Sequence, residues 1–294
     1  NRSGGLIASV SVLGSIIPPS IGFVVLGVAS GLSITKLFLA GIAPGLMIAM
    51  ALVIAWWWVS RRDNDVKLSP KASGKARTKA FVDSLWALML PVIIVAGLRF
   101  GVVTPTEAGA VASVYALLVS VLIYRELSMK SLGELLLRAG KTTAAVMFLV
   151  AAAGVSAWLI TTASIPQQVA DLVRPFMDNK MLLMFILMLM VFIIGTALDF
   201  TPTVLIMTPV LMPVVKEAGI DPVYFGVLFI INNAIGLVTP PVGTVLNVVC
   251  SIAKIPMSGA IKGVMPFMIA QTIVMLLLIV FPQIVMWPLH MMTR

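Results

Sequence analysis

The chain has 294 residues, of which 60% are hydrophobic and only 11% are charged, and its mean hydropathy is +1.11. Soluble domains carry about 25% charged residues, so this composition excludes a water-soluble protein and indicates one whose solvent is lipid. The formal net charge of +9 does not indicate nucleic-acid binding, because the basic residues gather in short linkers between apolar runs, as the positive-inside rule predicts for a membrane protein.

Apolar runs recur along the whole chain. A helix that crosses the hydrocarbon core of a bilayer needs about 17 to 25 predominantly apolar residues. Eight runs of about this kind lie at residues 4–30, 37–59, 84–100, 105–124, 141–162, 181–198, 222–252 and 264–288. Their number predicts an all-α polytopic membrane protein rather than a protein with one anchor.

The first residues show no signal-peptide pattern. The sequence opens on Asn1 without an initiator methionine and enters apolar sequence almost at once. We therefore expect no cleavable signal peptide and a longer protein that continues before residue 1.

Two linkers carry more than half of the basic residues. Seven of the 20 lysines and arginines lie in the polar linker at 61–83, and four more lie between residues 125 and 141. Loops rich in lysine and arginine stay on the cytoplasmic side of a membrane. We therefore expect both linkers in the cytoplasm.

Local patterns mark one helix start and two connectors. Thr104-Pro105-Thr106-Glu107 predicts a capping box with Thr104 as N-cap, Pro105 in the first turn and Glu107 closing the box. Residues 127–139 and 165–177 alternate charged and apolar residues at helical spacing. This spacing fits helices that lie flat at the membrane surface, and it fits solvated connectors equally well.

The chain repeats itself at an offset of 222 residues, without a gap. The offset pairs Gly14 with Gly236, Pro18 with Pro240, Pro19 with Pro241, Gly41 with Gly263 and Pro44 with Pro266. Five glycine and proline matches in one register indicate two copies of one structural unit. Residues 1–60 then form the end of the first repeat, 61–83 the cytoplasmic linker and 84–294 the second repeat.

Each copy carries two adjacent prolines inside an apolar run. The prolines remove two backbone donors, and their rings clash with the preceding turn, so the helix must break there. Unwound backbone at membrane depth survives only where it lines a cavity or packs against protein. Repeated helix breaks of this kind form the ion and substrate sites of secondary transporters.

Asp199 is the acidic residue that stands between two long apolar stretches, within the run Leu198-Asp199-Phe200-Thr201-Pro202-Thr203. Charge at membrane depth is costly, which makes an intramembrane carboxylate a functional hypothesis. One interpretation is a re-entrant hairpin at about 181–217 whose polar tip, Asp199 to Thr203, meets the second broken helix at about 222–252. The alternative is a full span at 181–198 with Asp199 at the water interface.

Whether the two copies are inverted or parallel in the membrane depends on whether 181–198 is re-entrant or a full span. A re-entrant 181–198 leaves three full spans between the copies and inverts them, whereas a full span makes them parallel. The count of basic residues on each side is the same in both arrangements. We prefer inverted repeats, because that architecture is common in transporters.

The sequence lacks the motifs that are typical of several other functional classes. His290 is the only histidine, which excludes a zinc-protease His-Glu-x-x-His site, and no Walker-type phosphate loop or potassium-channel filter is present. Cys250 is the single cysteine, so an intramolecular disulfide is excluded. An intramembrane enzyme would need a second catalytic group near Asp199, and the sequence offers none. We therefore predict a transporter and not an enzyme.

The motifs together resemble the large membrane subunit of the tripartite ATP-independent periplasmic (TRAP) transporters. The resemblance covers essentially the whole chain and rests on Ile16-Ile17-Pro18-Pro19-Ser20, Leu39-Ala40-Gly41-Ile42-Ala43-Pro44-Gly45, Thr104-Pro105-Thr106-Glu107-Ala108, Asp199-x-x-Pro202 and Gly236-Leu237-Val238-Thr239-Pro240-Pro241-Val242-Gly243.

This resemblance implies an elevator-type carrier in a bacterial inner membrane, with inverted repeats that each bear a hairpin. It implies sodium-coupled uptake of small organic acids such as C4-dicarboxylates or sugar acids. The partners it implies are a small four-helix membrane subunit and a periplasmic substrate-binding protein. A hairpin matching 181–217 would then precede residue 1. Alternatives are a stand-alone divalent-anion or ion exchanger without a binding protein, and a non-transport assembly protein or intramembrane enzyme.

The resemblance also implies the site residues. The sodium ligands would be Gly14, Ile17 and Ser20 in the first repeat and Gly236, Thr239 and Val242 in the second. The hairpin tip that shapes the substrate site would comprise Asp199, Thr201, Pro202 and Thr203. Sodium suits free carbonyl oxygens of this kind, which are abundant where helices unwind. No cofactor is expected beyond sodium as the coupling ion.

Overall fold

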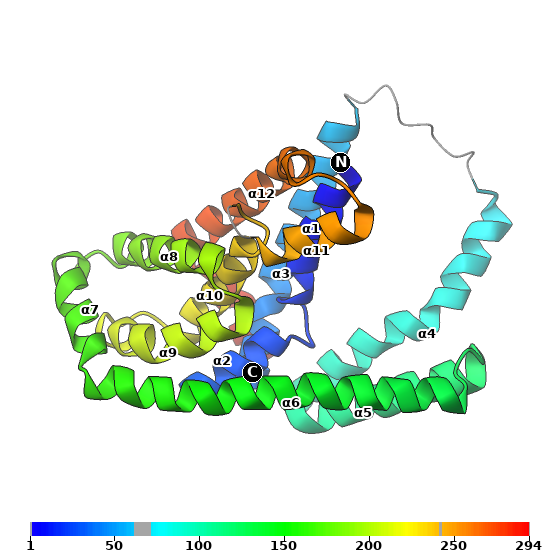
Figure 1. Cartoon of the computed structure of the whole chain (residues 1–294), viewed down its shortest axis with the longest axis horizontal. Coiled ribbons are helices and arrows are strands. Elements are labelled where there is room, and N and C mark those ends of the chain that lie inside the picture. Colours follow the sequence, from blue (N-terminus) through cyan, green and yellow to red (C-terminus); the bar gives the residue numbers. More distant parts are fainter. Residues whose placement is uncertain (1, 62–71, 241–242, 294) are drawn as a thin grey trace. The chain divides into compact units, whose positions relative to one another are not determined.

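The computed structural model describes residues 2–61, 72–240 and 243–293 (Figure 1), and all the regular secondary structure in them is helical. The α-helices are α1 (Arg2–Gly14), α2 (Ile21–Ser30), α3 (Ile34–Ser60), α4 (Gly74–Arg99), α5 (Pro105–Leu118), α6 (Met129–Thr162), α7 (Ile165–Val173), α8 (Lys180–Ala197), α9 (Phe200–Glu217), α10 (Pro222–Gly236), α11 (Thr244–Ala253), α12 (Met257–Val280) and α13 (Gln283–Met292). A π-helical turn, Val119–Ile123, extends α5, and a 3₁₀ turn, Arg174–Phe176, extends α7.

Six helices in the described residues are long and apolar enough to cross a membrane. They are α3, α4, α5 with its π-helical extension, α6, α8 and α12. The apolar runs 4–30 and 222–252 are each divided into two shorter helices, α1 with α2 and α10 with α11. The prediction of an all-helical, multi-pass membrane protein is confirmed.

Side-chain caps fix several helix starts. The predicted capping box is present, because Glu107 Oε2 accepts the Thr104 N–H at 2.8 Å and Thr104 Oγ1 accepts the Glu107 N–H at 3.4 Å. At the start of α10, Asp221 Oδ1 accepts the N–H groups of Val223 and Tyr224 at 2.8 and 3.0 Å. Each bond pairs a donor that the first helical turn leaves free.

The connectors differ in part from the sequence interpretation. The segment at 127–139, expected as a surface helix or a solvated connector, and the predicted span at 141–162 form one continuous helix, α6, because no proline interrupts it and Gly140 alone does not end a helix. With 34 residues, α6 is about 51 Å long, which exceeds a hydrocarbon core of about 30 Å. The segment at 165–177 does form a separate short helix, α7.

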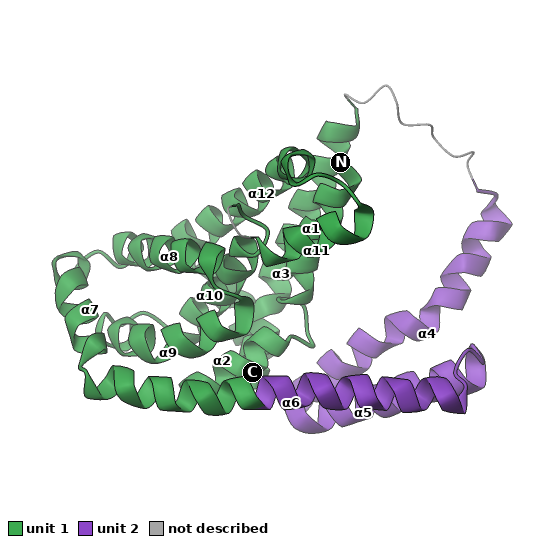
Figure 2. Cartoon of the chain, in the orientation of Figure 1, with its two compact units in different colours: residues 1–61, 148–294 green, residues 62–147 purple. Residues whose placement is uncertain are grey.

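The chain divides into two compact units (Figure 2). Unit 1 comprises residues 1–61 and 148–294, and unit 2 comprises residues 62–147. In unit 2, two tyrosine hydroxyls bond α4. Tyr115 of α5 donates to the Trp86 carbonyl at 2.8 Å, and Tyr124, just after the π-helical turn, donates to the Asp83 carbonyl at 2.7 Å. Unit 1 holds the two divided helices and the hairpin of α8 and α9.

Helix order in unit 1 follows the 222-residue offset. The helices α1 and α10 end at the paired glycines Gly14 and Gly236, and each is followed by a gap, a ten-residue helix and a long helix. The two sets also contact each other, because α1 packs on α12, and α10 packs on α3 as well as on α12. A Cβ atom on Gly226 of α10 would lie 3.2 Å from Leu37 of α3. Glycine therefore permits close approach of helices from the two copies.

A substitution of Gly5 in α1 tests this close approach of helices from the two copies. A Cβ atom on Gly5 would overlap the backbone of Gly263 in α12, so Gly5→Ala should destabilise the protein by about 1–3 kcal/mol through overpacking. The measurement is the thermal unfolding midpoint in detergent. Gly133→Ala in α6 is the control, because no heavy atom lies within 4 Å of its Cβ position. Equal destabilisation in the two variants would contradict the packing argument.

Candidate binding site at the helix interruptions

The first interruption lies between Gly14 and Ile21. The hydroxyl of Ser20 spans it, since it donates to the Ser15 carbonyl oxygen and accepts the Phe23 N–H at 3.2 Å. This pairing caps α2 and satisfies a carbonyl beyond the end of α1. The expected break at the paired prolines is present, because their missing N–H groups cannot continue the helix.

The predicted ligands of the first repeat gather at this interruption. Gly14 and Ile17 are exposed, whereas Ser20 is buried. A hydroxyl oxygen has two lone pairs, and the Phe23 N–H uses one of them on Ser20. Ser20 therefore keeps one acceptor position for a cation.

The second interruption separates Gly236 from Thr244. Thr239 is buried there, and its hydroxyl donates to the Ile235 carbonyl at 2.8 Å. At the end of the interruption, just before α11, Gly243 adopts φ +46°, a left-handed conformation that favours glycine. Val242, the third predicted sodium ligand of this copy, lies outside the described residues.

The helices α8 and α9 form a hairpin whose two ends are joined. Lys180 Nζ at the start of α8 donates to the Gly219 carbonyl, just after α9, at 2.8 Å. Figure 1 shows α9 running back toward the end at which α8 begins. The chain therefore leaves the hairpin at the end where it entered.

The hairpin tip, Asp199 to Thr203, follows the end of α8 and includes the first turn of α9. The Asp199 carbonyl accepts both the N–H and the hydroxyl of Thr203, at 3.2 and 2.8 Å. The Asp199 carboxylate is exposed and makes no capping bond, although it precedes α9. Thr203 is buried, whereas Thr201 and Pro202 are half-buried. The tip thus presents an exposed carboxylate.

This tip lies against both sides of the second interruption. A Cβ atom on Gly236 would lie 2.8 Å from the Gly195 carbonyl carbon near the end of α8. At the far side of the gap, Thr244 Oγ1 donates to Asp199 Oδ1 at 3.4 Å. The expectation that the polar tip adjoins the second broken helix agrees with these contacts.

Asn233 links the tip to α10 and has one oxygen without a partner. Its Nδ2 donates to the Phe200 carbonyl at 3.0 Å. Its Oδ1 is buried, receives no hydrogen bond, and would lie 2.9 Å from a Cβ atom on Gly195. A buried acceptor without a donor costs about 1–3 kcal/mol, so such an atom commonly marks a site for an ion or water.

Phe200 also contacts the first copy. A Cβ atom on Gly22 in α2 would lie 2.6 Å from the ring carbon Cζ of Phe200. The ring occupies space that a side chain on Gly22 would fill. The hairpin tip therefore lies between α2 of the first copy and α10 of the second.

Part of this arrangement is predictable from the sequence. The predicted residues Asp199, Thr203, Gly236 and Thr239 lie in it, and their roles as ligands stay predictions. Asn233 was not predicted, although a pair of adjacent asparagines inside the apolar run of α10, both buried, was a signal for it. The contact between Phe200 and Gly22 was not predicted either, and no local signal for it exists.

A multi-pass helical protein in which interrupted helices meet the tip of a hairpin falls into the class of secondary transporters. Comparison with known proteins identifies the family. The chain belongs to the family described as "Tripartite ATP-independent periplasmic transporter, DctM component", which matches residues 1–284. Because members of this family are transporter permease subunits, the chain is not an enzyme.

Three relatives illustrate the range of the family. The chain is 52% identical to the 2,3-diketo-L-gulonate TRAP transporter large permease protein YiaN of Escherichia coli, over 98% of the chain and 68% of the relative. It is 37% identical to the sialic acid TRAP transporter large permease protein SiaM of Vibrio cholerae, over 96% and 66%. It is 32% identical to the C4-dicarboxylate TRAP transporter large permease protein DctM of Pseudomonas aeruginosa, over 95% and 65%.

Two glycines at the same repeat position should respond differently to alanine. Gly236→Ala places a methyl group against the Gly195 backbone, whereas no heavy atom lies within 4 Å of a Cβ atom on Gly14. We expect Gly236→Ala to destabilise the protein by about 1–3 kcal/mol and Gly14→Ala to change the stability by less than about 1 kcal/mol. The thermal unfolding midpoints of the two variants provide the measurement. Equal midpoints would contradict the described contact of hairpin and helix end.

Proposed function

We propose that the protein is the translocation subunit of a binding-protein-dependent TRAP transporter that takes up small organic acids by sodium symport. The observation that carries this proposal is the position of Asp199 and Phe200, two residues of the hairpin tip, between the broken helices of both copies. The relatives named above are designated for 2,3-diketo-L-gulonate, sialic acid and C4-dicarboxylates. Their common chemistry supports a carboxylate substrate such as a C4-dicarboxylate or a sugar acid.

The residues at the interruptions fit sodium. A hard cation takes oxygen ligands, and unwound backbone with half-helix ends supplies carbonyl oxygens. The predicted sets are Gly14, Ile17 and Ser20 in the first copy and Gly236, Thr239 and Val242 in the second. The unpaired buried Oδ1 of Asn233 adds a further neutral oxygen beside the second set. A bound sodium ion would supply positive charge that offsets the substrate carboxylate near Asp199.

The joined ends of the hairpin support inverted repeats. Because the Lys180–Gly219 bond holds both ends together, the hairpin adds no net crossing of the membrane. The helices α4, α5 and α6 then count as three spans between the copies. An odd number of spans between the copies gives them opposite orientations in the membrane. This count favours inverted repeats over parallel ones.

The division into two units supports an elevator mechanism. Both interrupted helices and the hairpin belong to unit 1, which we propose as the transport region that carries the substrate. We propose unit 2, with α4 and α5, as part of the scaffold. An elevator needs such a compact binding region that can move as a body, since the site residues must keep their geometry during the crossing.

The exposed apolar surfaces support a membrane location and a membrane partner. In α6, no residue is buried, and Phe148 and Trp158 are among its exposed side chains. Lipid or another apolar helix must cover such a surface. We propose a bacterial inner membrane location, a small four-helix membrane subunit and a periplasmic substrate-binding protein as partners.

Uptake into proteoliposomes tests the proposed function. The full-length protein would be reconstituted with its small subunit and binding protein, and a panel of labelled organic acids would be supplied with and without an inward sodium gradient. We expect uptake that requires both sodium and the binding protein. Uptake without sodium would contradict symport, and uptake without the binding protein would identify a stand-alone exchanger.

Asn233 and its neighbour Asn232 give a matched test of the cation site. Both amides are buried, and each Nδ2 bonds a carbonyl, but of the two only Asn233 has a fully buried Oδ1 without a hydrogen-bond partner. We expect Asn233→Leu to raise the sodium concentration for half-maximal uptake by about tenfold, the effect of losing roughly 1.4 kcal/mol of binding free energy. Asn232→Leu should leave that concentration within about twofold. A larger increase of that sodium concentration in Asn232→Leu than in Asn233→Leu would place the cation away from Asn233.

A further inference from the structure

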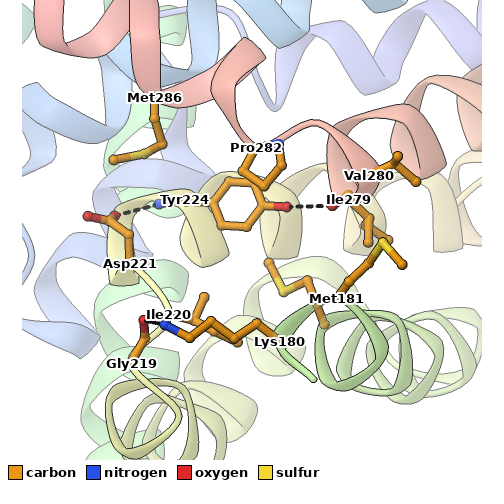
Figure 3. Close-up of a pocket in the computed structure, with 11 residues that line it drawn as sticks. Lys180, Met181, Gly219, Ile220, Asp221, Tyr224, Ile279, Val280, Pro282 and Met286 are labelled. Carbon is orange, nitrogen blue, oxygen red and sulfur yellow. Dashed lines mark hydrogen bonds between the residues drawn. The ribbon is translucent and has the colours of Figure 1, made fainter. Parts of the chain in front are cut away.

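Two adjoining cavities in unit 1 form a groove between α8 and α12. The first, of about 290 Å³, is lined by Met184 of α8 and by Ile279 of α12 (Figure 3). The second, of about 250 Å³, begins at the next residue of α8, Phe185, and shares Ile279. Neither adjoins Asp199, so the groove is separate from the candidate binding site.

The wall of this groove is apolar. Its polar side chains already have partners, because the Tyr224 hydroxyl donates to the Leu278 carbonyl at 2.9 Å and Asn232 Nδ2 donates to the Met188 carbonyl. The open side carries exposed apolar residues, among them Leu189 and Leu276 at 49% and 41% exposure. The groove therefore suits a hydrocarbon chain rather than a polar solute.

Two opposite charges lie at one end of the groove, on the lining of the first cavity (Figure 3). Lys180 is exposed, and its ammonium has three donors, of which the Gly219 carbonyl accepts one. Asp221 is also exposed, and its Oδ1 caps α10, while no described residue donates to its Oδ2. This end can bind one negative and one positive group at the same time.

The length of the groove matches one leaflet of a bilayer. Along α8 the lining extends from Lys180 to Phe192, which is about 18 Å at 1.5 Å per residue. Half of a hydrocarbon core is about 15 Å. With the charged end at the membrane surface, the second cavity reaches about the midplane.

We propose that this groove binds one zwitterionic phospholipid of the phosphatidylethanolamine type. Lys180 binds the phosphate, Asp221 binds the headgroup ammonium, and one acyl chain lies along the two cavities past Met184 and Ile279. The opposite charges at the rim and the one-leaflet depth favour this lipid over an apolar helix, which would leave both charges unpaired. The lipid would hold the base of the α8–α9 hairpin against α12.

The test is native mass spectrometry of the intact full-length protein, delipidated and then supplied with equal amounts of phosphatidylethanolamine and phosphatidylglycerol. We expect one retained lipid, with phosphatidylethanolamine favoured at least about fivefold, the effect expected for one charge pair near a membrane surface. Asp221→Asn keeps the helix cap and should remove that preference. Equal retention of the two lipids by the unaltered protein would overturn the headgroup assignment.

Two matched pairs test the remaining contacts. Lys180→Ala should lower lipid retention about fivefold, whereas Lys216→Ala, on the same hairpin but outside the groove lining, should not. Leu276→Trp fills the groove and should displace the lipid. Leu277→Trp is its control, because the two leucines are 41% and 40% exposed and only Leu276 lines the groove. The proposal would be overturned if Lys180→Ala and Lys216→Ala lowered lipid retention equally, or if Leu276→Trp and Leu277→Trp did. It would also be overturned if the unaltered protein retained no lipid.

Discussion

Backbone groups that leave a helix in apolar surroundings need polar partners or a cavity, and the candidate site of this protein is built around that requirement. The proline pairs end α1 and α10 and free carbonyl oxygens at both interruptions. The Ser20 hydroxyl pairs one of these carbonyls, that of Ser15, and the Thr239 hydroxyl donates to the Ile235 carbonyl near the end of α10. The rest of unit 1 brings the hairpin tip to the same place, so the site forms where the regular hydrogen bonding stops.

Close approach of backbones permits this convergence. Gly236 lies against Gly195, and the Phe200 ring lies over Gly22, at spacings that a Cβ atom would prevent. These glycines have α-helical or ordinary backbone conformations, so packing rather than a positive φ requires them. The interruptions, the hairpin and the long helices consequently form one compact unit in which a small side chain at a few positions determines the geometry.

Features set by local chemistry could be predicted from the sequence. The helix breaks at the proline pairs, the capping box at Thr104 and the polar tip at Asp199 each follow from neighbouring residues. The continuity of α6 was missed because its charged first half resembles a surface helix, although nothing in it ends a helix. The contacts of Asn233 and Phe200 were missed because they join residues far apart in the chain, and single-sequence patterns carry no information on such pairs.

Phe200 connects the interruption of the first copy to that of the second, and this connection gives the site a thermodynamic coupling that neither copy has alone. Its ring lies over α2, while its carbonyl accepts a bond from Asn233 in α10. A displacement of the tip that breaks the bond to α10 also uncovers Gly22 in α2. Ligands bound at the two interruptions, as proposed above, would therefore be linked through one residue, and linkage requires that each ligand change the affinity for the other by the same factor.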